Sequence, residues 1–348
     1  MKVSLITYHD EDNYGAILQA YATYKALVSI GVEAEVIDFR MPHKQNLLSK
    51  IIFSLRRYRH QSFRSKFLDR RTRIYNSLEE LRADPPMSDC YLVGSDQTWN
   101  PEISKEHAMA YFLDFGGDNV KRISYAASIG LGQWKEDRNA PTEKVKIALA
   151  KFHSILVREK QAVEICKNVF NVDAQQVVDP VLLFNSYPEL TGCYKTEKGK
   201  MVVYKLIKNM DFYNKSRIIA DYFDMHRVSV GSVRKLKGIR CPYPESVDNW
   251  VKQFATAVFV FTDSFHGTIL SLLYHKPFVI YVGDPKRVSR LTSILSEVGL
   301  LDRICTSEHS AEHLIKIAKS PIDWEFVDQR ILALREQSYE MLKVAIYE

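Results

Sequence analysis

The sequence predicts an α/β protein made of two Rossmann-like domains, each built on a mostly parallel sheet. Short apolar runs alternate with helix-length segments, which is typical of βα units. The alternation occurs twice, and a polar, turn-rich stretch near residues 185–200 separates the two series. The chain has 348 residues and is 46% hydrophobic, which is enough for two cores. We therefore predict an N-terminal domain of residues 1–190 and a C-terminal domain of residues 191–348 that ends in a closing helix.

The strands can be placed from their apolar runs. In the first domain we predict strands at residues 3–7, 36–39, 91–94, 123–127, 155–157 and 177–178. In the second domain they are residues 201–206, 228–230, 239–242, 258–261 and 278–281. Apolar residues at helical spacing begin at Tyr14 and end before Gly31, which predicts the first crossover helix. Residues 324–347 have the spacing of the final helix.

Positive charge is concentrated in one segment. The net charge is +6, yet residues 44–73 hold ten Lys or Arg and one acid, Asp69, so the rest of the chain sums to −3. This segment fits a solvated pair of helices, a peripheral contact with an anionic membrane surface, or a partner. We expect no nucleic acid ligand, because the chain has no recognition motif and no basic-aromatic repeat.

The cysteines and the N-terminus point to a cytoplasmic protein. The five cysteines lie far apart, which fits reduced thiols and not a disulfide framework or zinc site. The first residues turn polar too soon for a signal peptide or a membrane span. Localisation at the inner face of the membrane through residues 44–73 remains compatible with this prediction.

One strand end carries a candidate catalytic residue. The apolar strand 258–261 leads into a polar turn and then a helix predicted at residues 268–275, which places His266 at a helix N-terminus. Ligands of parallel sheets bind outside the carboxyl ends of the strands, and a helix N-terminus favours an anion. His266 is therefore a candidate acid or base, and a structural capping histidine is the alternative.

Two other strand ends carry polar side chains that could bind a ligand. The residues after these strands include Asp10, Asp12, Asn13, Tyr14, Ser95, Gln97 and Trp99. Asp96 could act as a base or cap the next helix. Trp99 could offer a flat face to a ligand or pack in the core.

Metal and cofactor sites have little support in the sequence. His309 and His313 have helical metal spacing, but no third ligand is evident, so we predict no metal site. The chain lacks a Gly-x-Gly-x-x-Gly motif and a phosphate-loop lysine, and we predict no bound cofactor.

Five sequence blocks, taken together and in their order along the chain, indicate a protein family. They are Asn13–Tyr21 (NYGAILQAY), Val93–Pro101 (VGSDQTWNP), Ser124–Ser128 (SYAAS), Val157–Lys160 (VREK) and Ser264–Gly267 (SFHG). Together they resemble the polysaccharide pyruvyl transferase family over about residues 1–285. The resemblance implies a GT-B-like protein, with two Rossmann-like halves around a cleft, that transfers pyruvate from phosphoenolpyruvate to a sugar as a ketal. It also implies a donor side on the second domain and an acceptor side on the first. There Asp96 would be a base on an acceptor hydroxyl, and the residues that would bind the sugar are Asp10, Asp12, Asn13, Tyr14, Ser95, Gln97 and Trp99.

The resemblance assigns roles to two residues. His266 would be the general acid that protonates the donor, or a ligand of its phosphate. Arg158, at the end of strand 155–157, would bind an anionic group of phosphoenolpyruvate. A salt bridge between Arg158 and a neighbouring acid on the other domain is the alternative.

The sequence departs from the family at one donor position. Family members often have an arginine two residues before the histidine, where this chain has Ser264. The missing cation could be replaced by the helix N-terminus with Ser264, Gly267 and Thr268, or by Lys205 at strand 201–206. The substitution leaves open a changed donor.

We therefore expect a pyruvyl transferase whose partners are phosphoenolpyruvate and a sugar or lipid-linked oligosaccharide. The basic segment fits a lipid-linked acceptor of surface polysaccharide biosynthesis, because anionic head groups attract Lys and Arg. A GT-B glycosyltransferase that uses a nucleotide sugar is the first alternative, since fold alone does not separate the two. A non-catalytic polysaccharide-binding protein is the second, and Ser264 favours it.

Overall fold

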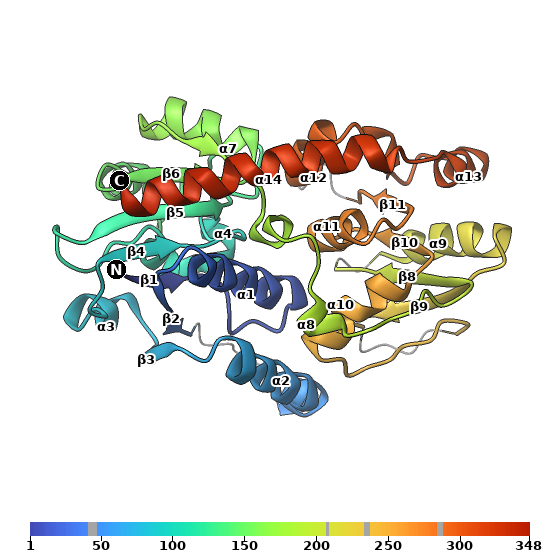
Figure 1. The fold of residues 1–348 in the computed structure, drawn as a ribbon, viewed down its shortest axis with the longest axis horizontal. Coiled ribbons are helices and arrows are strands. Elements are labelled where there is room, and N and C mark those ends of the chain that lie inside the picture. Colours follow the sequence, from blue (N-terminus) through green and yellow to red (C-terminus); the bar gives the residue numbers. More distant parts are fainter. Residues whose placement is uncertain (41–46, 207–208, 233–236, 284–287) are drawn as a thin grey trace. The chain divides into compact units, whose positions relative to one another are not determined.

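The chain folds into two α/β units, which confirms the predicted fold class (Figure 1). The computed structural model describes residues 1–40, 47–206, 209–232, 237–283 and 288–348, and only the backbone of residues 47–53. Unit 1 comprises Met1–Gln45, Arg64–Leu183 and Leu332–Glu348, and unit 2 comprises Asn46–Phe63 and Phe184–Ile331.

These unit bounds differ from the predicted domains in two ways. The chain passes into unit 2 after Leu183, and its last 17 residues return to unit 1. The return has a structural reason: Ser338 in the final helix accepts a hydrogen bond from the Val178 N–H at 3.0 Å, and Arg335 donates to the Leu182 carbonyl at 2.7 Å. Contacts of this kind, between residues over 150 positions apart, cannot be read from local composition.

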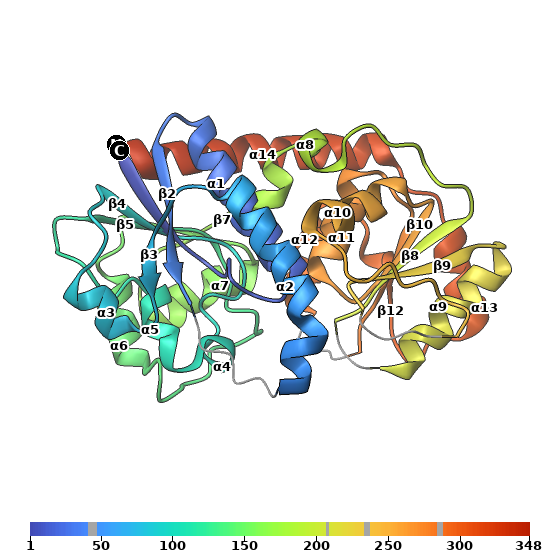
Figure 2. The same cartoon turned by 90° about the horizontal axis from the view of Figure 1, so that it is seen from below.

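Unit 1 contains a seven-stranded sheet in the order β3-β2-β1-β4-β5-β6-β7, and all its strand pairs are parallel. Its strands are β1 (Lys2–Ile6), β2 (Glu33–Phe39), β3 (Arg71–Tyr75), β4 (Cys90–Val93), β5 (Lys121–Ala127), β6 (Ser154–Val157) and β7 (Gln175–Gln176). The inner strands β1 and β4 are buried on both faces, as parallel sheets covered by helices require. Figure 2 shows the strands of this sheet running side by side.

The helices of unit 1 follow the strands as crossovers. They are α1 (Tyr14–Ser29), α3 (Leu78–Ala83), α4 (Pro101–Ser104), α5 (Ala108–Tyr111), α6 (Thr142–Leu149) and α7 (Lys160–Ile165). The predicted helix at Tyr14 is confirmed: the Asn13 side chain caps it by accepting from the Gly15 N–H at 2.9 Å. Gly31, with φ +86°, follows its end. The predicted final helix is confirmed as α14 (Trp324–Tyr347).

The basic segment 44–73 does not form a pair of helices. It contains α2 (Leu47–Phe67) and then β3, while residues 44–46 lie outside the described residues. The sequence Arg-Thr-Arg-Ile-Tyr of β3 has three polar residues followed by two apolar ones, and β3 is an edge strand of its sheet. Charged side chains are common on edge strands, because they discourage pairing with a further chain.

Unit 2 contains a five-stranded parallel sheet in the order β12-β11-β10-β8-β9. Its strands are β8 (Lys200–Tyr204), β9 (His226–Val230), β10 (Phe259–Thr262), β11 (Phe278–Tyr281) and β12 (Ile304–Cys305). The predicted strand 239–242 is reduced to a parallel bridge between Arg240 and Val228 beside β9. This bridge extends the strand order to the arrangement of a Rossmann fold.

The helices of unit 2 cover both faces of its sheet. They are α8 (Pro188–Thr191), α9 (Met210–Tyr222), α10 (Val247–Thr256), α11 (Phe265–Leu273), α12 (Ser289–Glu297) and α13 (Ala311–Lys319). One face packs on α9 and α13 through a core that includes Val203, Phe212 and Leu314. On the other face Tyr204 packs against Trp250 of α10, with ring centroids 5.2 Å apart.

Each sheet has a point where the strand order reverses. In unit 1 it lies between β1 and β4, and in unit 2 between β8 and β10. Ligands of open parallel sheets bind outside the carboxyl ends of the strands at such points. These two edges are therefore where functional side chains are expected.

Candidate functional site

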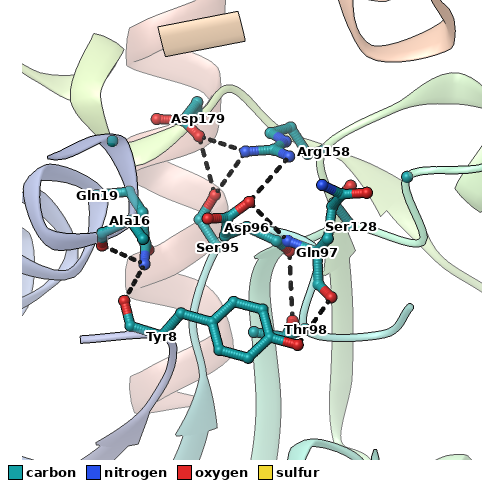
Figure 3. Close-up of polar contacts among 12 residues, drawn as sticks. Tyr8, Ala16, Gln19, Ser95, Asp96, Gln97, Thr98, Ser128, Arg158 and Asp179 are labelled. Carbon is teal, nitrogen blue, oxygen red and sulfur yellow. Dashed lines mark hydrogen bonds and ion pairs between the residues drawn. The ribbon is translucent and has the colours of Figure 1, made fainter. Parts of the chain in front are cut away.

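A buried ion-pair network lies at the carboxyl edge of the unit 1 sheet (Figure 3). Arg158 follows β6, and its Nη1 lies 2.8 Å from Asp179 Oδ2 and 3.3 Å from Ser95 Oγ. Ser95 follows β4 and donates its hydroxyl to the same Asp179 oxygen at 2.9 Å. The Asp179 side chain is wholly buried, and the Arg158 side chain is 3% exposed.

Three carboxylates surround this single guanidinium. Besides Asp179, Asp96 Oδ1 lies 4.0 Å from Arg158 Nη2, and Glu159 Oε2 lies 3.8 Å from Arg158 Nε. Burial by itself lowers the pKa of Arg158, but the carboxylates of Asp179, Glu159 and Asp96 outweigh it, and the pKa is raised above its usual value. Arg158 therefore stays charged, and its partner acids belong to unit 1 itself.

Asp96 has an unusual backbone conformation. Its φ is +74°, a region that non-glycine residues rarely occupy and that often marks functional sites. Its Oδ1 accepts from the Gln97 N–H at 2.8 Å. Asp96 does not cap the next helix, because Asn100 does so by accepting from the Glu102 N–H at 3.1 Å. Its side chain is 12% exposed, so Asp96 is the member of the network that a ligand can reach.

Glu159 ties the network to the loop after β5. Its Oε1 accepts from Ser128 Oγ at 2.5 Å and from the Gly130 N–H at 3.1 Å. Gly130 has φ +71°, and a Cβ added there would lie 2.1 Å from Gln97 Oε1. The loops after β4, β5 and β6 thus stabilise one another. Glu159 is not among the predicted site residues.

A second polar cluster lies at the ends of β1 and β2. His9 is 1% exposed, with Nδ1 3.1 Å from the Thr7 carbonyl and Nε2 3.2 Å from Asp38 Oδ1. Burial raises the pKa of Asp38, but hydrogen bonds from Arg40 and His9 outweigh it and hold that pKa well below its usual range.

This cluster continues to the surface. Arg64 Nη1 lies 2.5 Å from Asp10 Oδ1 and 3.3 Å from the carbonyl oxygen of His9. His9 and Asp38 were missed in the sequence, although both stand at the end of a predicted strand. Their position at strand ends was the signal that could have identified them as site residues.

Three of the predicted acceptor residues are buried in the structure. Trp99 is wholly buried and donates its indole N–H to the Tyr111 carbonyl at 2.9 Å. Its ring stacks on that of Phe112, with ring centroids 5.4 Å apart. Tyr14 is 2% exposed, and Ser95 is wholly buried. An aromatic residue beside a strand end packs in the core as readily as it faces a ligand.

The other predicted acceptor residues are partly exposed. They are Asp10, Asp12, Asn13 and Gln97. Asn13 uses its side-chain oxygen to cap α1, and Gln97 accepts from Asn100 Nδ2 at 3.1 Å. Their exposure keeps them as acceptor-binding candidates.

The carboxyl edge of unit 2 places His266 in the first turn of a helix. The helix α11 begins at Phe265, three residues earlier than predicted, because Ser264 is its N-cap and accepts from the Gly267 N–H at 3.3 Å. His266 is 7% exposed. Gly267 is required here, since a Cβ would lie 2.4 Å from Thr262 Oγ1.

The hydroxyls predicted to bind the donor hold the start of α11 instead. Thr268 Oγ1 donates to the Ser264 carbonyl at 3.1 Å, and Thr268 is wholly buried while Ser264 is 2% exposed. Lys205 is also placed differently from the prediction. Its Nζ lies 4.6 Å from the centre of the Tyr213 ring, on the face that α9 covers, whereas α11 follows β10 and packs with α10.

Glu245 is a buried acid near the end of β9. Its Oε2 accepts from the Gly231 N–H at 3.0 Å, and burial raises its pKa from 4.5 to about 7, against the opposing effect of that bond. Because the folded pKa is the higher one, protonated Glu245 stabilises the fold fully below about pH 4.5, and this contribution is lost as the pH rises through 7.

The pH dependence of stability should therefore change in Glu245→Gln. Relative to this variant, the wild-type free energy of unfolding is expected to fall by about 3 kcal/mol between pH 4.5 and pH 8, as 1.36 kcal/mol per pKa unit implies. Urea unfolding of both proteins at several pH values measures the difference. A constant difference across this range would contradict the prediction.

Solved structures share this fold. UDP-N-acetylglucosamine 2-epimerase from Rickettsia bellii aligns with a TM-score of 0.56 at 13% identity, covering 100% of this chain and 99% of that one. The Neisseria meningitidis UDP-GlcNAc 2-epimerase bound to UDP-GlcNAc aligns with a TM-score of 0.55 at 12% identity, covering 99% of each chain. Arabidopsis thaliana UGT89C1 aligns with a TM-score of 0.52 at 12% identity, covering 98% of this chain and 95% of that one. The protein therefore has a GT-B-like fold.

The family is shown by the sequence itself. The family model for polysaccharide pyruvyl transferase matches residues 13–285, which is most of the chain, and no curated protein matches. The chain belongs to the polysaccharide pyruvyl transferase family, as the five sequence blocks predicted.

Proposed function

We propose that the protein transfers pyruvate from phosphoenolpyruvate to a sugar of a surface polysaccharide, or of its lipid-linked precursor, and forms a ketal. The observation that carries the proposal is the position of His266. It stands in the first turn of α11, at the strand-order reversal of unit 2, in a chain that matches the family model over residues 13–285.

The proposed reaction needs two proton transfers. A proton is added to C3 of phosphoenolpyruvate, which becomes the methyl group, and C2 becomes electrophilic. Two sugar hydroxyls form bonds to C2, and the bond from C2 to the phosphate oxygen breaks. One hydroxyl proton balances the proton gained by C3, and the other leaves with inorganic phosphate. The enzyme therefore needs an acid for C3 and a base for the hydroxyls.

His266 is the acid in this proposal. An imidazolium is suited to donate a proton near neutral pH, and the N-terminal end of α11 carries the partial positive charge that favours a phosphate or carboxylate. The family arginine is absent here, since Ser264 occupies its position and caps the helix. Without that arginine, donor binding in unit 2 depends more strongly on the N-terminus of α11.

Asp96 is the base in this proposal, and Arg158 positions it. Arg158 was expected to bind the donor, but its guanidinium is 3% exposed and contacts Asp179 and Ser95. We assign it to holding the Asp96 carboxylate, whose side chain is 12% exposed and is the most exposed in the network. Asp10, Asp12, Asn13 and Gln97 would bind hydroxyls of the acceptor.

A nucleotide-sugar glycosyltransferase is the second candidate. The observation that favours it is the likeness in fold to two UDP-N-acetylglucosamine 2-epimerases, one of them bound to UDP-GlcNAc, although identity of 12–13% supports the fold alone. A non-catalytic polysaccharide-binding protein is the third candidate, favoured by Ser264 at the position of the family arginine.

Label transfer separates the candidates. Phosphoenolpyruvate with carbon-14 in its pyruvyl carbons is incubated with the protein and a panel of free and lipid-linked saccharides. We expect label in a saccharide and an equal amount of released phosphate. Turnover of a UDP-sugar with phosphoenolpyruvate unchanged would support the glycosyltransferase instead. Since phosphoenolpyruvate is a cytoplasmic metabolite, we place the reaction in the cytoplasm.

A further inference from the structure

The helix α2 has an exposed face of unusual composition. Among its residues with described side chains, a strip at helical spacing faces solvent: Ser54, Leu55, Tyr58, Gln61, Ser62, Ser65 and Lys66, here called the α2 strip. Tyr58 is 69% exposed and Leu55 is 49% exposed. The opposite face is buried and includes Phe63 and Arg64. The α2 strip thus combines an aromatic and an aliphatic side chain with small polar residues.

Cations flank the α2 strip, and the sequence of the helix has no acid. At about 100° per residue, Arg57 and Arg59 lie on opposite sides of Tyr58, and both are partly exposed. Lys66 extends the positive charge along the strip, and its Nζ lies 4.7 Å from the centre of the Phe67 ring. Leu47–Phe67 contains six Lys or Arg and no Asp or Glu.

We propose that the α2 strip is a docking surface for an anionic lipid membrane. Tyrosine and leucine are suited to the level of the lipid head groups, and arginines on either side can reach the lipid phosphates while their stems cover apolar surface. Nucleic acid is less well matched, because single-strand binding uses several stacking aromatics and the α2 strip offers one. No helix among the described residues is long and apolar enough to span a membrane, so the contact is peripheral.

This inference stands without the proposed activity. Vesicle binding needs neither phosphoenolpyruvate nor an acceptor, so a failure of one proposal is distinguishable from a failure of the other. If both hold, the surface would bring the enzyme to lipid-linked saccharides.

Co-sedimentation with vesicles tests the proposal. The full chain is expected to sediment with phosphatidylglycerol–phosphatidylcholine vesicles and not with pure phosphatidylcholine, and salt should weaken the binding. Each cation near the surface contributes about fivefold to the affinity, so the triple variant Arg57→Gln, Arg59→Gln, Lys66→Gln should lose roughly a hundredfold. Tyr58→Ser, which removes an exposed ring and no charge, should weaken binding severalfold.

Matched variants separate charge from folding. Arg57→Lys with Arg59→Lys keeps the charge and should retain binding. Removing three exposed lysines elsewhere, in Lys135→Gln, Lys146→Gln, Lys151→Gln, changes the net charge equally and should leave binding within a few-fold of wild type. Any of three results would overturn the proposal. The wild-type chain could bind neutral vesicles equally well, or this control could lose as much binding as the triple variant of α2. The third is displacement by a single-stranded oligonucleotide at lower concentration than by lipid.

Discussion

Replacing His266 by alanine is expected to slow pyruvyl transfer by roughly 10²–10⁴-fold, the range typical for loss of a general acid. The variant retains the Ser264 cap and the Gly267 backbone that hold the start of α11, so the binding surface should persist. The initial rate of phosphate release from phosphoenolpyruvate, measured with an accepted saccharide, gives the loss. The reduction should appear in kcat, because the acid acts in the chemical step.

A histidine at the other edge of the same sheet is the matched control. His226 begins β9, its side chain is 48% exposed, and it pairs with Glu197. His226→Ala should keep wild-type turnover. Equal activity of His266→Ala and wild type, with both folded by circular dichroism, would remove His266 from the mechanism.

Arg158→Ala is expected to lower the free energy of unfolding by about 3–5 kcal/mol, the usual cost of breaking a buried ion pair from one side. The reason is that Asp179, Glu159 and Asp96 would remain close together without their shared cation. Urea unfolding followed by circular dichroism measures the change. Because the chain has two units, the change should appear in the unfolding transition of unit 1.

An exposed arginine in the same unit provides the comparison. Arg82 pairs with Asp114 on the surface, with side chains 49% and 40% exposed, and Arg82→Ala should cost at most about 1 kcal/mol. The double variant Arg158→Met, Asp179→Leu should recover part of the loss, since no buried charge is left from that pair. A similar small cost for Arg158→Ala and Arg82→Ala would show that the network does not stabilise unit 1.

The sequence was most informative where strands are buried. Parallel strands such as β1 and β10 are near-continuous apolar runs, so their ends, and the polar residues that follow, could be placed from local pattern. This is why Asp96 and His266 were found at sheet edges. In contrast, β3 was missed because an edge strand rich in arginine has the composition of a solvated helix.

Long-range pairing is what the sequence left undetermined. Arg158 was identified, but its principal partner Asp179 lies 21 positions away and is wholly buried. Trp99 and Tyr14 were assigned to the ligand surface because pattern alone does not show which side of a loop faces the core. His9 and Asp38 come together only because β1 and β2 are neighbours in the sheet, at 29 positions of separation.

The most direct test of the pyruvyl transferase account is the melting temperature of the purified protein with phosphoenolpyruvate, inorganic phosphate, UDP and GDP. A ligand at 100 times its dissociation constant adds about 2.7 kcal/mol to the native state, which is several degrees for most domains. The account predicts a rise with phosphoenolpyruvate that exceeds the rise with phosphate. Stabilisation by UDP or GDP without any by phosphoenolpyruvate, or no stabilisation by any of the four, would contradict it.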